Sequence, residues 1–495
     1  MNLAAIIEPH DADRIAIYSR GKPTTYGELR EQVGALRGGL RDLGIGPGDR
    51  VALLFSNKRF FVDALFATLG LGAVAVPLNP SSPALEIAHQ IATIGAKVVF
   101  VGPSARAAWH LVAHDQIPTI EHVISPSGHD IDGAVTLEDL LVAEPVPIVD
   151  VEPGDLAVLL FTSGTAGSPR AAMLSHGNLL ANQDQMLAEG GRMEADDVVY
   201  GVLPVHHIFG LNVMLGLTLR VGATVVLVQR FDPATALETI AERKVTVVPG
   251  APPMWLAWSH MSADPASFAG VRLALTGADK MPEEAAQVLL DRYGVVLREG
   301  YGLTEASPVV TSSSQIDPRP GSIGKPVPGQ EIRLVDSDGD DVEPGDTGEL
   351  WVRGPNVFKG YWHDPEATAR ALTPEGWLRT GDIAMQDEEG YFYIVDRAKD
   401  LIIVSGFNVF PAEVEEVLLD HPAIAETAVV GVPHPHTGEA VKAYVVLREG
   451  VVLDEEQVVA WCQDHLARYK CPNKVLFTEE LPKGLGGKLL RRVLR

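Results

Sequence analysis

The stretch at residues 161–171 has the composition of a loop that holds phosphate. It reads Phe-Thr-Ser-Gly-Thr-Ala-Gly-Ser-Pro-Arg-Ala and follows a short apolar run that predicts a buried strand. Hydroxyl side chains can donate to an anion, glycines let the backbone approach it closely, and Arg170 adds a fixed positive charge. A surface turn is the alternative interpretation. The hydroxyl and glycine positions are Thr162, Ser163, Gly164, Thr165 and Gly167.

Two further motifs follow predicted strands, and ligands of open α/β sheets bind at the carboxyl ends of strands. The first is Tyr301-Gly302-Leu303-Thr304-Glu305, which offers a ring for a base, a hydroxyl for a phosphate and a carboxylate for Mg²⁺. The second lies at residues 276–279, where Gly277 and Ala278 are small enough to admit a flat heterocycle. A helix N-cap is the alternative role for Thr304.

Three other positions carry reactive or charged groups. His206 and His207 end a predicted strand, where a metal or acyl-transfer role competes with that of buried, hydrogen-bonded histidines. Asp382 follows a tight glycine turn and can accept hydrogen bonds from two sugar hydroxyls. Lys488 closes the glycine-rich segment at residues 481–488, a mobile cationic tip suited to a reacting carboxylate or phosphate.

The composition of the 495-residue chain is that of an ordinary globular protein, with 46% hydrophobic and 21% charged residues. A formal net charge of −25 argues against a general nucleic-acid binder. The two cysteines, Cys462 and Cys471, are too few for a disulfide framework or a zinc cluster. No run is long enough to cross a bilayer and no signal peptide is recognisable, so we expect a cytoplasmic protein.

The arrangement of the elements changes along the chain. Apolar runs alternate with helix-length segments between about residues 155 and 300, and an earlier set near residues 50–77 repeats the design. The sequence therefore predicts an α/β fold with a large N-terminal domain of two doubly wound lobes. Short strands after about residue 320 predict a small β-barrel, and the final segment predicts an α+β module beginning near the charged stretch at residues 396–400.

In this order and over nearly the full length, the motifs resemble the adenylate-forming superfamily, most closely its long-chain fatty acid CoA ligases. The resemblance rests on residues 161–171, 301–305, 379–382, 395–413 and 488–492. It implies an ATP- and acyl-binding domain at residues 1–396. It also implies a mobile C-terminal domain at residues 397–495, which rotates as a lid and carries the catalytic lysine.

The resemblance also implies a role for each position of the large domain. Residues 162–167 would embrace the ATP phosphates together with Arg170, and Thr304 would contact phosphate. Glu305 would hold Mg²⁺ with the help of Thr162. Within the motif at residues 301–305, Gly302 belongs to the nucleotide-binding turn. Gly277, Ala278 and Tyr301 would flank adenine, and His207 occupies the family's gating position beside the acyl pocket.

For the C-terminal part, the resemblance implies nucleotide and CoA contacts. Asp382 and Arg397 would bind ribose, and Lys399 would lie at the hinge. Lys488 would neutralise the acid carboxylate and the α-phosphate as the acyl-adenylate forms. After rotation, Gly406 would line the pantetheine tunnel.

The sequence departs from the family pattern at five positions. Ala166 removes a hydroxyl donor that the family loop usually has, Arg170 replaces a lysine, and Ala171 replaces a glycine. Near Lys488, two glycines stand where threonine or serine is usual and should loosen the tip. We therefore expect weakened ATP binding or a slow first half-reaction. The two glycines are Gly484 and Gly486.

These features predict an AMP-forming ligase that joins a medium- or long-chain fatty acid to CoA, with ATP, Mg²⁺ and CoA as cofactors and co-substrates. An aromatic acid, a carrier-protein thiol as acceptor, and a non-catalytic nucleotide-binding protein are the alternatives. The net acidity disfavours firm adhesion to anionic lipid, although the C-terminal arginines leave weak peripheral contact open. The oligomeric state also stays open, a homodimer included.

Overall fold

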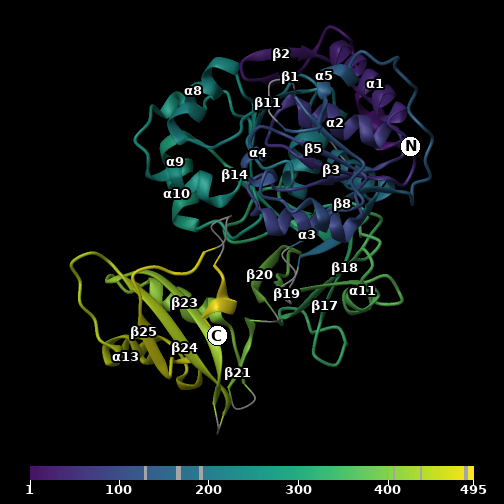
Figure 1. The fold of residues 1–495 in the computed structure, drawn as a ribbon. Helices are drawn as coiled ribbons and strands as arrows, with labels where there is room; N and C mark the ends of the chain where they lie inside the picture. The colour runs from purple at the N-terminus through teal and green to yellow at the C-terminus, as the bar shows by residue number, and fades with distance from the viewer. Residues whose placement is uncertain are drawn as a thin grey trace. The chain divides into compact units, whose positions relative to one another are not determined.

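The computed structural model describes residues 1–126, 131–162, 169–188, 193–397, 400–404, 407–434, 437–483 and 489–494. The chain divides into two compact units (Figure 1). The first unit consists of residues 1–332 and 352–379, and the second of residues 333–351 and 380–495. The sequence predicts a domain boundary after residue 396, at the hinge about which the C-terminal domain would rotate. This boundary stays a prediction.

The first unit contains a seven-stranded sheet that is parallel except at one edge. Its edge strand β9 runs antiparallel to β8, so the stretch between them connects two strands of one hairpin. The sequence reading expected a helix directly after this stretch and missed β9. The order is β7 (Val135–Thr136), β6 (His122–Ser125), β5 (Val98–Val101), β3 (Arg50–Leu54), β4 (Val74–Pro77), β8 (Leu156–Thr162) and β9 (Arg170–Ser175).

Helices alternate with the strands of this sheet along the chain, and the residues of its central strands are buried. Helix α1 begins with a capping box in which the side chains of Thr25 and Glu28 each bond the other residue's backbone N–H. One core cluster joins Val76, Ile91 and Trp109. The helices are α1 (Tyr26–Asp42), α2 (Arg59–Gly70), α3 (Ala84–Ile94), α4 (Arg106–Trp109) and α5 (Leu137–Leu140).

A nine-stranded sheet forms the rest of the first unit's framework. Its central strands are parallel, whereas the N-terminal hairpin β1–β2 and the strands β15 and β16 add antiparallel edges. The order is β16 (Lys325–Pro326), β15 (Val309–Ser312), β14 (Leu297–Gly302), β13 (Leu273–Thr276), β12 (Val247–Gly250), β10 (Val198–Gly201), β11 (Thr224–Leu227), β1 (Ile15–Ser19) and β2 (Lys22–Thr25).

Helices α8, α9 and α10 gather beside this sheet (Figure 1). Helix α6 begins at a capping box between Ser175 and Asn178. A nine-residue π-helix, η3 (Phe209–Leu217), follows the loop after β10. The α-helices are α6 (His176–Leu187), α7 (Thr218–Arg220), α8 (Pro233–Arg243), α9 (Pro252–His260), α10 (Glu283–Tyr293) and α11 (Pro365–Ala371), and the short 3₁₀ turns are η1 (Leu3–Ile7), η2 (His114–Gln116), η4 (Pro265–Phe268) and η5 (Thr304–Ala306).

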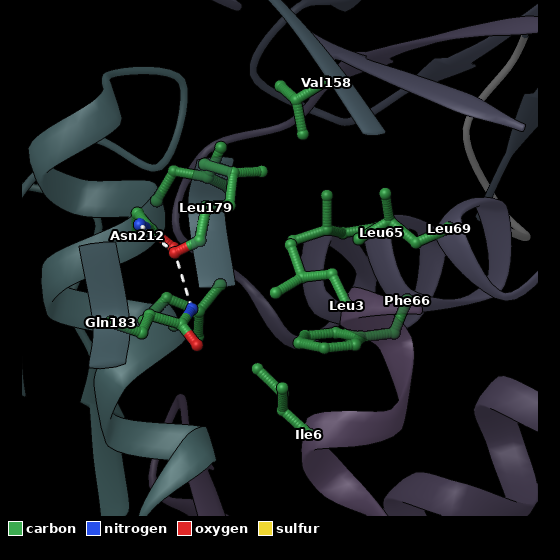
Figure 2. A pocket seen from close by; sticks show the side chains of 12 residues that line it. Leu3, Ile6, Leu65, Phe66, Leu69, Val158, Leu179, Gln183 and Asn212 are labelled. Carbon is green, nitrogen blue, oxygen red and sulfur yellow. Dashed lines mark hydrogen bonds between the residues drawn. The ribbon is translucent and has the colours of Figure 1, made fainter. Parts of the chain in front are cut away.

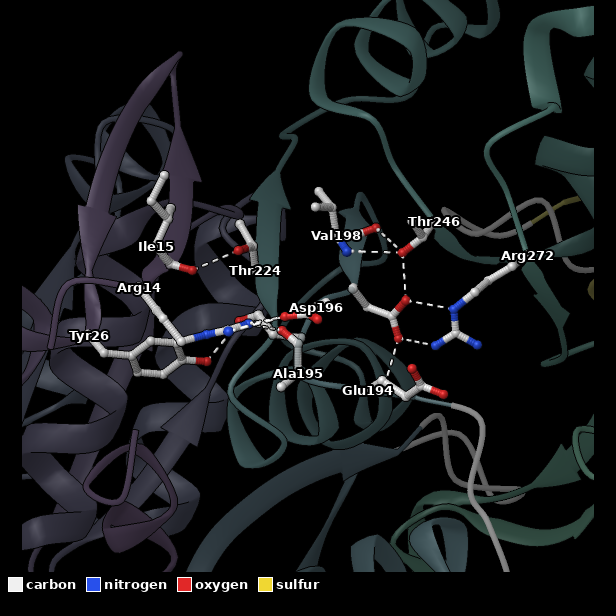
Figure 3. Close-up of polar contacts among 12 residues, drawn as sticks. Arg14, Ile15, Tyr26, Glu194, Ala195, Asp196, Val198, Thr224, Thr246 and Arg272 are labelled. Atoms are coloured by element: carbon white, nitrogen blue, oxygen red, sulfur yellow. Dashed lines mark hydrogen bonds and ion pairs between the residues drawn. The ribbon is translucent and has the colours of Figure 1, made fainter. Parts of the chain in front are cut away.

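A buried carboxylate ties together the amino ends of three strands of the nine-stranded sheet (Figure 3). Asp197 precedes β10 and accepts from Arg272, which precedes β13, with Nε at 2.8 Å from Oδ1. The Thr246 hydroxyl, at the start of β12, donates to the same oxygen at 2.7 Å. The Glu194 backbone N–H donates to the other oxygen at 2.7 Å. Asp197 thus fixes the relative positions of β10, β12 and β13.

A small cavity of about 10 Å³ lies where η1, α2, β8, α6 and η3 meet (Figure 2). Its walls are mostly aliphatic, and the polar exceptions are Gln183 and Asn212, whose side chains bond each other at 2.8 Å. Such a volume holds one water molecule at most. The cavity is therefore a packing defect and has no room for an acyl chain.

The second unit carries a four-stranded sheet and a five-stranded sheet. Where the sequence predicts a small β-barrel, the described residues form an open four-stranded sheet. Its order is β17 (Glu331–Val335), β18 (Gly348–Arg353), β19 (Leu378–Gln386) and β20 (Phe392–Arg397). The expected α+β module contains α12 (Pro411–Leu419), α13 (Glu455–His465), β21 (Ile402–Val404), β22 (Phe407–Val409), β23 (Ile424–His434), β24 (Gly438–Leu447) and β25 (Lys474–Phe477), with short turns η7 (Arg468–Lys470) and η8 (Arg491–Val493).

The predicted fold class is confirmed, because a large N-terminal part is built on parallel sheets and a smaller α+β part follows. Strand β12 starts at Val247, two residues later than its apolar run suggests. Strand β14 begins where the predicted strand ended, at Leu297. Within the part of the chain that the structure describes, no helix is both long and apolar enough to span a membrane.

Asp63 on α2 is fully buried, and its carboxylate oxygens have no hydrogen-bond partner among the described residues. Burial raises its pKa from 3.8 to about 7, against the opposing effect of Arg59 at 3.4 Å. The folded chain therefore holds this proton more tightly than the unfolded chain. The stability that depends on it is fully present below about pH 4 and is lost as the pH rises through 7.

We therefore expect Asp63→Asn to remove the loss of folding stability that accompanies rising pH. The difference in free energy of unfolding between variant and wild type should grow in the variant's favour by on the order of 1 to 3 kcal/mol between pH 5 and pH 8, measured by urea denaturation. Asp42→Asn, at an exposed carboxylate on α1, is the matched control and should show no such pH-dependent difference. A constant difference for Asp63→Asn would contradict the assignment.

Candidate active site

The carboxyl ends of β13 and β14 bring together the residues expected around adenine. Strand β13 ends at Thr276, directly before Gly277 and Ala278, and β14 carries Tyr301. Thr276 pairs with Glu299 in the parallel register, so the turn after β13 lies beside the last residues of β14. This edge is where open α/β sheets bind ligands.

Close backbone contacts explain the small residues at this edge. A Cβ atom added to Gly277 would lie 3.0 Å from the Gly300 carbonyl oxygen. A Cβ on Gly302 would lie 2.1 Å from the Pro308 carbonyl oxygen, which no side chain can tolerate. Ala278 has a φ of 76°, a left-handed conformation that is uncommon for alanine. The small residues thus allow the backbone segments at this edge to pack closely.

Glu305 lies together with Thr304 in the turn η5, which follows the end of β14. Its carboxylate Oε1 accepts a hydrogen bond of 2.7 Å from the Tyr361 hydroxyl. Its backbone carbonyl accepts a bond of 2.8 Å from the Phe358 N–H. Both the side chain and the main chain of Glu305 are thus held by one segment, residues 358–361.

The donor set at this site fits a Mg²⁺ ion that arrives with a nucleotide. Among the described residues, no group of three or more His, Cys, Asp or Glu side chains could hold a metal by itself. A single carboxylate such as Glu305, with a hydroxyl such as Thr162, leaves most coordination positions to phosphate oxygens and water. Mg²⁺ commonly binds proteins in this way.

Buried amide side chains hold the turn that follows Glu305. Asn182 on α6 forms two bonds with Val309, its Nδ2 donating to the carbonyl at 2.8 Å and its Oδ1 accepting from the N–H at 3.1 Å. Asn212 on η3 donates to the Ser307 carbonyl at 2.7 Å. The Ser307 hydroxyl in turn donates to the Asn356 carbonyl at 2.8 Å. The sequence reading missed this network, although the amide-rich stretch at residues 178–185 was a visible signal.

The two ends of the phosphate loop are described, whereas the loop itself, residues 163–168, is not. Thr162 and Arg170 face each other in the β8–β9 ladder. The Arg170 Nε donates to Asp364 at 2.9 Å, and its guanidinium lies over the Tyr361 ring, 5.8 Å from the centroid. An open cleft of about 410 Å³ adjoins this ion pair, so solvent screens it and its main effect is to place Arg170.

His206 and His207 follow β10 in a turn that is fixed from the other sheet. Asn57, which is buried after β3, donates to the Leu203 carbonyl at 2.8 Å and accepts from the Val205 N–H at 3.2 Å. The centroids of the two imidazole rings lie 4.7 Å apart. The family's gating position is thus connected to the seven-stranded sheet.

Both imidazoles are neutral at physiological pH. Burial, and secondarily the neighbouring His207, lowers the pKa of His206 to about 3. The dense surroundings of His207 also lower its pKa by desolvation, although the residue itself is exposed at the surface. Neutral rings suit the wall of an apolar pocket. The gating role of His207 stays a prediction.

Glu299 is a partly buried carboxyl that the sequence reading did not single out. It stands beside Thr276 in the register, and the Met281 backbone N–H donates to it. Burial raises its pKa to about 7, an effect to which Glu283 adds. The Thr276 hydroxyl is buried without a hydrogen-bond partner among the described residues. The edge of the sheet thus offers a proton-holding carboxyl and an available hydroxyl.

In the second unit, the structure brings together the two residues expected to bind ribose. Asp382 on β19 pairs with Arg397 on β20 across the antiparallel ladder. Gly381 precedes Asp382 with a φ of 71°, and the Asp382 N–H donates to the Thr380 hydroxyl at 3.1 Å. The turn therefore fixes the backbone of Asp382.

Several predicted site residues lie outside the described part of the chain, so their roles stay predictions. They belong to the phosphate loop, the hinge, the pantetheine tunnel and the C-terminal tip. The side chain of Arg397 also lies outside the described part of the structure. These residues are Ser163, Gly164, Thr165, Ala166, Gly167, Lys399, Gly406 and Lys488.

Comparison with known proteins matches most of the chain. Residues 7–362 match the AMP-binding enzyme family, and residues 413–488 match the AMP-binding enzyme C-terminal domain. A feruloyl-CoA synthase from an Amycolatopsis species is 38% identical, over 99% of this chain and 96% of its own length. A long-chain-fatty-acid–CoA ligase from Escherichia coli O157:H7 is 37% identical, over 98% and 92%.

A solved structure is similar over the whole chain. ATP-bound MatB from Rhodopseudomonas palustris superposes with a TM-score of 0.91 and 33% identity, covering 100% of this chain and 98% of that one. The family match includes the turn after β13, the motif at residues 301–305 and Tyr361. By these matches, the chain belongs to the AMP-binding enzymes of the adenylate-forming superfamily.

Proposed function

We propose that the protein activates a carboxylic acid with ATP and then transfers the acyl group to CoA. The observation that supports this most strongly is the juxtaposition of the turn at Gly277 and Ala278 with the end of β14, which carries Tyr301 and precedes the anchored Glu305. In the first step an acid oxygen attacks the α-phosphorus and pyrophosphate leaves. In the second step the CoA thiol attacks the acyl carbon and AMP leaves.

The residues divide this work between binding and charge neutralisation. Bound Mg²⁺ supplies positive charge beside the phosphates, and Glu305 with Thr162 would hold it. Tyr301 and the glycine turn would orient adenine, and Asp382 with Arg397 would orient ribose. Lys488 would offset the charge of the attacking carboxylate, and Lys399 would lie at the hinge that exchanges it for Gly406.

The acid that we propose is an apolar monocarboxylate, with medium- and long-chain fatty acids first and aromatic acids second. The fatty acid ligase and feruloyl-CoA synthase relatives are about equally similar, so both classes are supported. The sequence offers six apolar candidates for the acyl pocket, of which Phe209 is half-buried and the other five are buried. They are Phe209, Leu211, Met214, Pro252, Met254 and Trp255. No cationic side chain stands among these candidates, which disfavours a dicarboxylate.

The first test is an acid panel. We expect AMP release with ATP, Mg²⁺ and CoA to be fastest with an apolar straight-chain acid, slower with ferulate and slowest with malonate. Fastest turnover with ferulate would reassign the substrate class to aromatic acids. Replacing CoA by a phosphopantetheinyl carrier protein tests the acceptor. Absence of AMP release with every acid and acceptor would contradict the proposed function.

The second test separates catalysis from nucleotide binding alone. We expect Lys488→Ala to lower acid-dependent pyrophosphate exchange by about 100-fold to 1,000-fold, because it removes the charge that faces the attacking carboxylate. Lys483→Ala is the matched control, since Lys483 pairs with Glu426 on the surface. Equal exchange in wild type and Lys488→Ala would favour the non-catalytic alternative.

The third test concerns the departure at Ala166. Restoring the hydroxyl donor in Ala166→Thr should lower the apparent KM for ATP by about 2-fold to 10-fold, the effect of one added hydrogen bond. Ala166→Val has a similar shape without the hydroxyl and is the control. An unchanged KM in Ala166→Thr would show that this position does not limit ATP binding.

A further inference from the structure

Tyr361 connects two parts of the site that lie far apart in the sequence. Its hydroxyl donates to Glu305, 56 residues earlier, at 2.7 Å. Its ring lies beneath the guanidinium of Arg170, at the end of the phosphate loop. No motif in the sequence marks Tyr361 for either contact.

The hydrogen bond from Tyr361 fixes one carboxylate oxygen of Glu305. Oε1 accepts from Tyr361, and the backbone carbonyl of Glu305 accepts from Phe358. The side chain is therefore held at both ends, and the direction in which Oε2 points is set by these bonds. A carboxylate oriented in this way binds a cation without the entropy cost of ordering a free side chain.

The segment that carries Tyr361 is itself fixed. The Tyr361 N–H donates to the Thr368 hydroxyl at 2.9 Å, and its ring meets Phe358 edge-on with centroids 5.0 Å apart. Asp364 accepts from Arg170 and also caps α11 through the Ala367 N–H at 2.9 Å. Glu305 and Arg170 are thus both attached to residues 358–364.

The hydrogen bond between the two side chains has a fixed direction, because the Tyr361 hydroxyl donates and the Glu305 oxygen accepts. A donor of this kind orients the carboxylate and offers no competing negative charge to a cation.

We propose that Tyr361 is a positioning residue that aims the Glu305 carboxylate at the divalent cation carried by the nucleotide phosphates and links it to Arg170. This inference rests on the proposed function for the identity of the nucleotide. Tyr361 would touch neither the nucleotide nor the acid. It would couple the Glu305 carboxylate to Arg170, at the end of the phosphate loop.

The test is Tyr361→Phe, which removes the hydroxyl and keeps the ring over Arg170. Binding of Mn²⁺·ATP without acid or CoA, followed by calorimetry and by the electron paramagnetic resonance of free Mn²⁺, should weaken by about 10-fold to 100-fold. The melting temperature should change no more than in Tyr293→Phe. That control removes a hydroxyl that donates to the Met261 carbonyl away from the site.

A double-mutant cycle decides whether Tyr361 acts through Glu305. Tyr361→Phe combined with Glu305→Gln should bind Mn²⁺·ATP no more weakly than Glu305→Gln alone. Unchanged binding in Tyr361→Phe, or additive losses in the double variant, would overturn the proposal. Because binding is measured without acid, a wild type that binds Mn²⁺·ATP but activates no acid refutes the proposed function and leaves this inference standing.

Discussion

The register of the nine-stranded sheet depends on Asp197, a carboxylate that is 3% exposed and paired with Arg272. An isolated charge at such a site would be costly, so Asp197 is stable there only while Arg272, Thr246 and the Glu194 N–H surround it. Those partners come from the amino ends of different strands. Because neighbouring strands are parallel, aligning their amino ends also aligns their carboxyl ends. At the carboxyl ends Thr276 of β13 lies beside Glu299 of β14.

Around Glu305, order comes from polar groups that do no chemistry themselves. The amides of Asn182, Asn212 and Asn356 satisfy the backbone of the turn at residues 306–309. Tyr361 then fixes the carboxylate from the other side. The turn is buried, so its backbone groups need partners inside the protein, and hydrogen bonds with fixed directions specify its conformation. Residues 358–364 thus contact both the Glu305 turn and Arg170.

Local patterns in the sequence predicted most strands and the residues at their carboxyl ends, because apolar runs and glycine turns are short-range signals. The same reading missed β9, whose Arg170–Ser175 segment is brief and directly precedes the cap of α6. It also missed the bond from Tyr361 to Glu305 and the Asp197 cluster. Partners so far apart in one sequence are joined only by the folded topology, and no spacing rule reveals them.

The π-helix η3 connects the two turns of the site through its winding. Its hydrogen bonds span one residue more per turn than those of an α-helix, so each residue turns through a smaller angle. With this winding the Phe209 ring lies beside Gly277, in the turn after β13, while Asn212 donates to the Ser307 carbonyl. The same residues wound as an α-helix would point in different relative directions and would not make both contacts. The winding of one helix thus sets the positions of two side chains at separate turns.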